Sequence, residues 1–126
     1  MNLHSYLTRL YTTITSRQEI GIESLGIEYI VTGVALFTAV LRFFDNSSLI
    51  IEEEIEEQLD QTINKLRYKY HYQDANNELV FRYDNVPHHP SIRTFPHHKH
   101  EGAKVVPSEP IDLSLVLQEI DQHLYN

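Results

Sequence analysis

Tyr68-Lys69-Tyr70-His71-Tyr72-Gln73-Asp74 is followed, across Ala75-Asn76-Asn77, by Glu78-Leu79-Val80-Phe81-Arg82-Tyr83-Asp84. Apolar or aromatic side chains alternate with polar ones in both segments. This period of two predicts half-buried β-strands over residues 65–74 and 78–84. Asparagine tolerates a positive φ, so a two-residue turn at Asn76-Asn77 can close the two strands into a hairpin.

The turn fixes the register of this hairpin. It predicts four cross-strand pairs: Tyr72 with Phe81, Tyr70 with Tyr83, His71 with Arg82, and Lys69 with Asp84. One face is then apolar and is expected in the core: Tyr68, Tyr70, Tyr72, Leu79, Phe81 and Tyr83. The other face is polar and mainly cationic: Lys65, Arg67, Lys69, His71, Gln73, Arg82 and Asp84. A slip of one residue would mix the two sets, so the pattern supports this register.

Helices are predicted at both ends of the chain. Apolar residues recur at helical spacing over residues 3–16, and a second helix is expected to open at Ser108 and Pro110. Residues 19–31 and 34–44 are rich in β-branched and aromatic side chains and predict two strands joined at Thr32-Gly33. Residues 86–106 contain several prolines and are predicted to be loop.

The segment 49–66 fits two structures. Ile51, Ile55, Leu59 and Ile63 recur every fourth residue behind Ser48, which fits an N-cap, so the periodicity favours a helix. The turn residues Asp45-Asn46-Ser47-Ser48 favour instead a strand over 49–57 that pairs back on residues 34–44.

Length and composition predict one domain over residues 1–126. The chain has no cysteine, which excludes disulfides, zinc–thiolate sites and a thiol nucleophile. No apolar run reaches the roughly 20 residues that cross a bilayer, and the start lacks signal-peptide features, so a cytoplasmic protein is expected. Together the elements predict an α+β fold: an antiparallel sheet of about five strands, packed by an N-terminal and a C-terminal helix, with a long histidine-rich loop.

Charge and histidine are concentrated in the second half of the chain. The net charge is −8, yet residues 65–104 hold seven of the ten Lys and Arg residues against four acidic ones. A locally positive segment can bind a polyanion despite a negative total. The same segment contains the clusters Pro87-His88-His89-Pro90 and Phe95-Pro96-His97-His98-Lys99-His100. Histidine transfers protons near neutral pH and binds metals, so these clusters are candidates for chemistry.

Three ordered blocks resemble the TumE family: the block 68–74 quoted above, Leu79-Val80-Phe81-Arg82-Tyr83-Asp84-Asn85-Val86-Pro87-His88-His89-Pro90, and Thr94-Phe95-Pro96-His97-His98-Lys99-His100. The resemblance is close from about Lys65 to the C-terminal helix and looser before it. In that family the stretch after an Asp-Gly-Ser-like turn is a strand that contains a glutamate. Asp45-Asn46-Ser47 stands at the turn here and Glu53 at the glutamate, so the resemblance implies a strand for residues 49–57.

The resemblance also implies a function. TumE proteins are toxin partners of toxin–antitoxin modules, so it implies a cytosolic toxin encoded beside an antitoxin that carries a helix-turn-helix domain. The expected architecture is similar to that of small metal-independent RNase toxins such as the RelE-like group, which is an analogy of fold alone. Whether the protein forms a homo-oligomer is left open by the sequence.

RNA cleavage at the 2′-hydroxyl needs a base, an acid for the leaving 5′-oxygen and a cation for the developing charge. His71 beside Arg82 would supply one proton-transfer group and a phosphate clamp. Together with the clusters and the family glutamate, this predicts a catalytic set that needs no cofactor: His71, Arg82, His88, His97, His98, His100, Lys99 and Glu53. The expected RNA-binding residues are Lys65, Arg67, Lys69, Gln73, Arg93 and Lys104.

Two alternatives stay open. A divalent metal ion could be bound by His98, His100, His88 and Asp84 and could activate water for phosphodiester hydrolysis. Adjacent histidines of a strand-like segment point in opposite directions, so alternate residues such as His98 and His100 would ligate together. Otherwise the same surface binds an acidic partner or a nucleic acid without catalysis.

Overall fold

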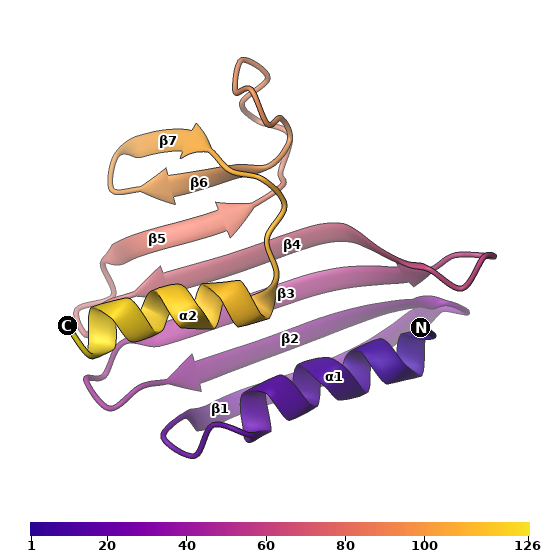
Figure 1. Cartoon of the computed structure of the whole chain (residues 1–126), viewed down its shortest axis with the longest axis horizontal. Helices are drawn as coiled ribbons and strands as arrows, with labels where there is room; N and C mark the ends of the chain where they lie inside the picture. The colour runs from indigo at the N-terminus through magenta and orange to yellow at the C-terminus, as the bar shows by residue number, and fades with distance from the viewer.

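The computed structural model describes all 126 residues, which form two helices and one seven-stranded antiparallel sheet. The elements follow one another as α1 (Leu3–Thr15), β1 (Gly21–Val31), β2 (Val34–Arg42), β3 (Ser48–Glu57), β4 (Ile63–Gln73), β5 (Leu79–Asp84), β6 (His98–Glu101), β7 (Lys104–Pro107) and α2 (Leu113–Leu124). The strands lie in the sheet in their sequence order, so each one pairs with its neighbours along the chain (Figure 1). The α+β fold with a helix at each end is confirmed.

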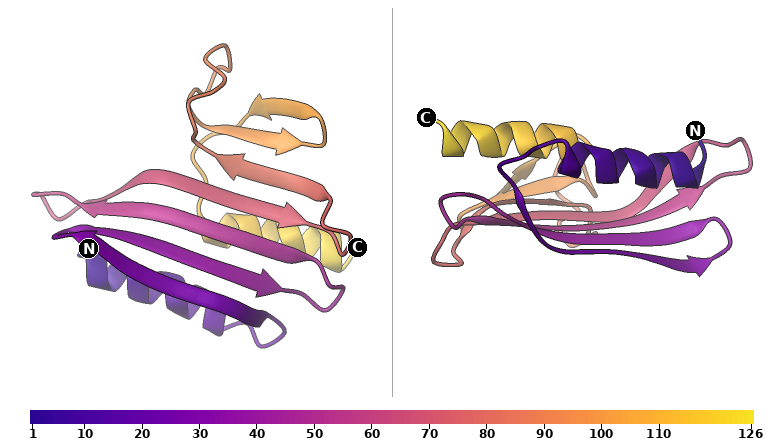
Figure 2. Two further views of the ribbon diagram at one scale, coloured as in Figure 1. Left: turned by 180° about the vertical axis from the view of Figure 1, so that it is seen from behind. Right: turned by 90° about the horizontal axis from the view of Figure 1, so that it is seen from below.

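Both helices cover one face of the sheet, and we call the opposite face the open face (Figure 2). The core lies between the helices and the covered face. The helices contribute Leu3, Leu7, Leu10, Ile14, Leu113, Val116, Leu117 and Ile120, all buried. Neither helix has the length and apolar character needed to cross a membrane.

The predicted register of the β4–β5 hairpin is confirmed. All four predicted cross-strand pairs are present, and Tyr72 and Phe81 are buried on the covered face. The predicted two-residue turn is wrong. The Asn77 N–H donates to the Asp74 carbonyl, only Asn77 has a positive φ of 64°, and an irregularity at Tyr72/Gln73 absorbs the extra residue. This is a three-residue turn combined with a bulge.

Lys65 lies on the opposite side from the predicted one. A register shift beside Glu54 leaves Leu66 and Arg67 both exposed and turns Lys65 to the covered face. Its Nζ donates to the Tyr70 hydroxyl at 2.6 Å and to the Ile111 carbonyl at 3.0 Å. The bulge reverses the alternation of side chains, which a strict period of two cannot anticipate.

Residues 48–57 form strand β3, as the resemblance implies, and the helix favoured by periodicity is wrong. Ile51 and Ile55 are four residues apart, and four is an even number, so both residues also share one face of a strand. Both are fully buried on the covered face.

The prediction of about five strands is wrong because the segment 86–106, predicted to be loop, contains two more. β6 pairs with β5, placing His100 beside Arg82 and His98 beside Asp84. A turn with Gly102 at φ 59° then leads into β7. Residues 85–97 contain no helix or strand. The last helix also begins later than predicted, after its N-cap Asp112.

Candidate functional site

Strands β4, β5 and β6 place His71, Arg82 and His100 in one row on the open face. His71 is the cross-strand partner of Arg82, and Arg82 is the partner of His100. Directly opposed residues of antiparallel strands have Cβ atoms roughly 4.5–5.5 Å apart. Arg82 therefore stands between the two histidines in this row, and we call these three residues the His–Arg row.

Arg82 has unused hydrogen-bonding capacity. Its Nε lies 3.3 Å from Asp84 Oδ2, but this buried nitrogen makes no hydrogen bond of proper geometry. About a third of the side chain, 34%, is exposed. A buried donor without a partner costs free energy, and such donors in native structures call for an explanation. The exposed part of the side chain can meet a phosphate, because guanidinium groups bind phosphate through paired N–H donors.

His71 is set up to accept a proton. Its Nε2 lies 3.1 Å from the Gln73 amide oxygen, and the Gln73 nitrogen donates to the Asn77 side chain at 3.1 Å, which fixes the orientation of the amide. The amide oxygen can only accept, so Nε2 carries the hydrogen and Nδ1 keeps its lone pair. Burial lowers the pKa of His71, and the positive charges of Arg82 and Lys69 lower it further. The ring is therefore largely neutral near neutral pH.

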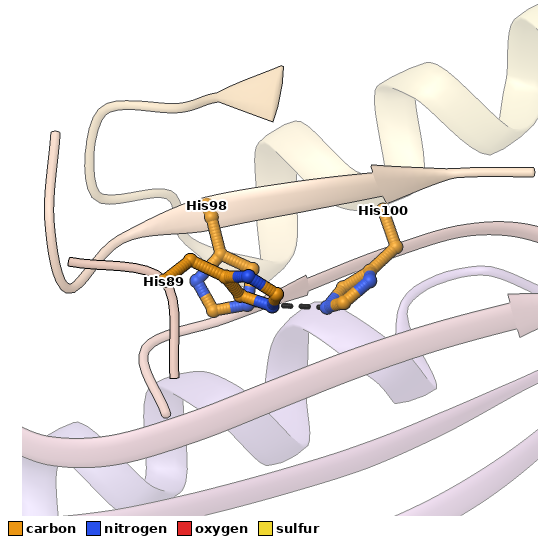
Figure 3. A group of neighbouring side chains, drawn as sticks. All are labelled: His89, His98 and His100. Atoms are coloured by element: carbon orange, nitrogen blue, oxygen red, sulfur yellow. Dashed lines mark hydrogen bonds between the residues drawn. The ribbon is translucent and has the colours of Figure 1, made fainter. Parts of the chain in front are cut away.

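His100 belongs to a hydrogen-bonded chain with His98 and Asp84. The His98 Nε2 lies 3.1 Å from His100 Nε2 and 2.9 Å from Asp84 Oδ1. Burial lowers the pKa of His100, as does Arg82. His98 and Asp84 are almost fully buried, whereas the His100 side chain is partly exposed, so His100 is the accessible end of this chain. The His89 ring, from the loop 85–97, packs edge-on against both histidines (Figure 3).

Three predicted catalytic residues of the histidine clusters lie outside the His–Arg row and the adjoining chain of His98 and Asp84. His88 is exposed. Lys99 points to the covered side because β6 alternates its side chains, and His97, just before β6, points the same way. His97 Nδ1 lies 2.9 Å from the Tyr68 hydroxyl, and Lys99 Nζ donates to Glu119 at 2.7 Å.

Glu53 is also on the covered face, with 0% of its side chain exposed. It accepts a hydrogen bond of 2.6 Å from the Tyr6 hydroxyl and another from the Tyr70 hydroxyl, and it lies 3.8 Å from Lys65 Nζ. Burial raises the pKa of both tyrosines and lowers that of Lys65. The sheet separates this satisfied network from the His–Arg row, so Glu53 cannot touch a substrate bound there.

The open face as a whole carries mixed charge, because Glu52 and Glu54 of β3 lie beside the cationic face predicted for the hairpin. The basic residues of β4 are paired across the strand boundary, Lys69 with Glu52 at 2.7 Å and Arg67 with Glu54 at 3.4 Å. The other expected RNA-binding residues are dispersed. Gln73 is held by His71 and Asn77, Arg93 lies 3.5 Å from Glu109, and Lys104 is exposed on β7. Arg82 is therefore the central cation of this face.

Nothing in the sequence distinguishes His89 from its neighbour His88. Which of two adjacent loop residues turns inward depends on the path of residues 85–97, and prolines on both sides give no alternation to follow. The convergence of His98 and His100 was predicted, because alternate residues of an extended segment share a side.

Comparison with known proteins bears on this arrangement. A family model described as toxin TumE matches residues 11–124, a span that runs from within α1 to the end of α2 and includes every strand and both histidine clusters. No curated protein and no solved structure matches the chain. The matched span covers most of the sequence, and the chain therefore belongs to the TumE family of toxins.

Proposed function

We propose that this toxin is a ribonuclease that cleaves RNA at the His–Arg row without a metal ion. The observation that supports the proposal is that Arg82 lies between His71 and His100 in the sheet. The buried Nε of Arg82 has no hydrogen-bond partner. The expected site of action is the cytoplasm, and the expected partner is an antitoxin with a helix-turn-helix domain.

The row has the dimensions of one phosphodiester. Adjacent strands are about 4.8 Å apart, so β4 and β6 stand about 10 Å apart on either side of Arg82. In the proposed reaction Arg82 binds the scissile phosphate through its N–H groups. His71 accepts the proton of the 2′-hydroxyl through Nδ1, and the 2′-oxygen forms a bond to phosphorus. The bond to the 5′-oxygen then breaks, and His100 donates a proton to that oxygen. The products are a 2′,3′-cyclic phosphate and a free 5′-hydroxyl.

Because burial and Arg82 lower the pKa of His100, its protonated form is the minor one near neutral pH and a strong acid, and the charge of Asp84 favours that form. His98 and Asp84 therefore support the acid in this scheme. A proton lost by His100 can be replaced through its contact of 3.1 Å with His98 Nε2. Asp84 Oδ1, at 2.9 Å from the same nitrogen, stabilises the imidazolium while His98 carries the charge. Neither residue needs to reach the substrate, so both are positioning residues.

Substitution of His71 tests the assignment of the base. His71→Ala is expected to lower the cleavage rate by about two to four decades, the usual contribution of a proton-transfer group. Because the pKa of His71 is lowered, its neutral form persists below the ordinary histidine pKa of about 6.5. As the pH is lowered, the wild-type cleavage rate should therefore begin to fall only below about 6.5, where His71 becomes protonated. This acidic limb of the pH–rate profile should be absent from His71→Ala.

His4→Ala is the matched control, since His4 is exposed on α1, on the helix side of the sheet. Its rate and pH profile should equal those of the wild type. A His71→Ala variant that keeps both the rate and the acidic limb would show that another group is the base.

A further inference from the structure

Four potential ligand groups converge beside the first residue of β6. His89 comes from the loop 85–97, and His98 and His100 come from β6 (Figure 3). Asp84 comes from the end of β5. One nitrogen of each histidine lies within 4.8 Å of the other two. The Asp84 oxygens lie 2.9 Å from His98 Nε2 and 3.4 Å from His100 Nε2.

The tautomer of His98 is set by the backbone. Its Nδ1 lies 2.8 Å from the Pro96 carbonyl oxygen, which can only accept, so Nδ1 carries a hydrogen. In the neutral ring the Nε2 lone pair then points at the Asp84 carboxylate and at His100 Nε2. Lone pairs and negative charge that face one another are stabilised by a cation between them, which is either a proton on Nε2, as in the hydrogen-bonded chain described above, or a metal ion that replaces it. A carbonyl that accepts from the second ring nitrogen is also the usual partner of a metal-bound histidine.

The distances match the coordination sphere of a small transition-metal ion. Zinc–nitrogen bonds of about 2.0–2.1 Å in a tetrahedron place neighbouring ligand atoms about 3.4 Å apart. His98 Nε2 lies 3.1 Å from His100 Nε2 and 2.9 Å from Asp84 Oδ1, and His100 Nε2 lies 3.4 Å from Asp84 Oδ2, all close to this value. Imidazole ligands favour Zn²⁺ over Mg²⁺ or Ca²⁺, which prefer oxygen.

We propose that His89, His98, His100 and Asp84 bind one divalent transition-metal ion, with Zn²⁺ the best fit. Asp84 also contacts Arg82, so its negative charge offsets the repulsion between the ion and the guanidinium. The binding of the ion does not depend on RNA cleavage, but its effect on activity rests on the function proposed above. An ion held by His100 Nε2 occupies the nitrogen through which His98 returns a proton to His100, so Zn²⁺ acts as a reversible inhibitor.

Metal titration of the full-length chain tests the site directly. Co²⁺ alone is expected to bind at one ion per chain and to give the intense visible absorption of tetrahedral coordination, and Zn²⁺ should displace it. His89→Ala should weaken binding by at least about 100-fold. His89 lies in a loop, so this variant tests the site even where His98→Ala fails to fold. His88→Ala is the matched control and should bind as the wild type does.

Three results would overturn the metal site: no saturable binding of either ion, equal losses in His88→Ala and His89→Ala, or a Co²⁺ spectrum without tetrahedral bands. An RNA cleavage assay on the same samples separates the two proposals. Metal binding without cleavage under any condition leaves the site intact and removes the ribonuclease. Cleavage without metal binding supports the ribonuclease and overturns the metal site.

Discussion

Replacing Arg82 with alanine is expected to lower the rate of RNA cleavage by about two to three decades, the scale on which removal of one preorganised donor acts. Arg82, on β5, is the cation at the centre of the His–Arg row, and the basic residues of β4 that share its face, Arg67 and Lys69, are paired with glutamates. Single-turnover kinetics on a defined RNA would measure the loss. Arg82→Lys keeps the charge but not the planar fork of donors, so its rate should be intermediate.

Arg9→Ala is a suitable control, since Arg9 is exposed on α1, away from the open face. Its rate should equal that of the wild type. The thermal unfolding midpoint of each variant has to be measured as well. A loss of activity in Arg82→Ala that merely follows a loss of folded protein would contradict the role in phosphate binding.

Phe81→Ala is expected to lower the free energy of unfolding by about 3–5 kcal/mol, the usual cost of removing a buried aromatic ring. Phe81 is 1% exposed and packs against Tyr72 and Tyr83, with ring centroids 5.3 and 5.5 Å away. Urea denaturation would measure the change, and Phe81→Leu, which refills much of the cavity, should cost less. A loss under about 1 kcal/mol would mean that the two faces of the hairpin are reversed.

The central hairpin could be predicted from the sequence because its alternation is strong and its aromatic residues fall on one face. Other elements carry weaker signals. The fourfold spacing of Ile51 and Ile55 fits a helix and a strand equally well, and the pairing of β3 with β2 and β4 decides between them. Strands β6 and β7 have four residues each, are rich in histidine, lysine or valine, and follow three prolines. β6 depends on pairing with the edge of β5, and β7 on pairing with β6, which local sequence does not encode.

Each part of the candidate site could be predicted only where the pairing of its strands could be predicted. His71 and Arg82 follow directly from the hairpin. His100 joins them only because β6 pairs with β5, and the same alternation turns His97 and Lys99 to the covered side. Glu53 was assigned to the site from the family resemblance alone. Its partner in β4 is Tyr68, a core residue, and the two therefore share the covered face.

Cleavage of a defined RNA by the purified toxin in excess EDTA tests the central claim most directly. The His–Arg row predicts that cleavage continues at the rate seen without chelator or faster, that the products carry a 2′,3′-cyclic phosphate, and that Arg82→Ala loses this activity. Cleavage that stops in EDTA and returns when a divalent ion is added, or no cleavage under either condition, would contradict it.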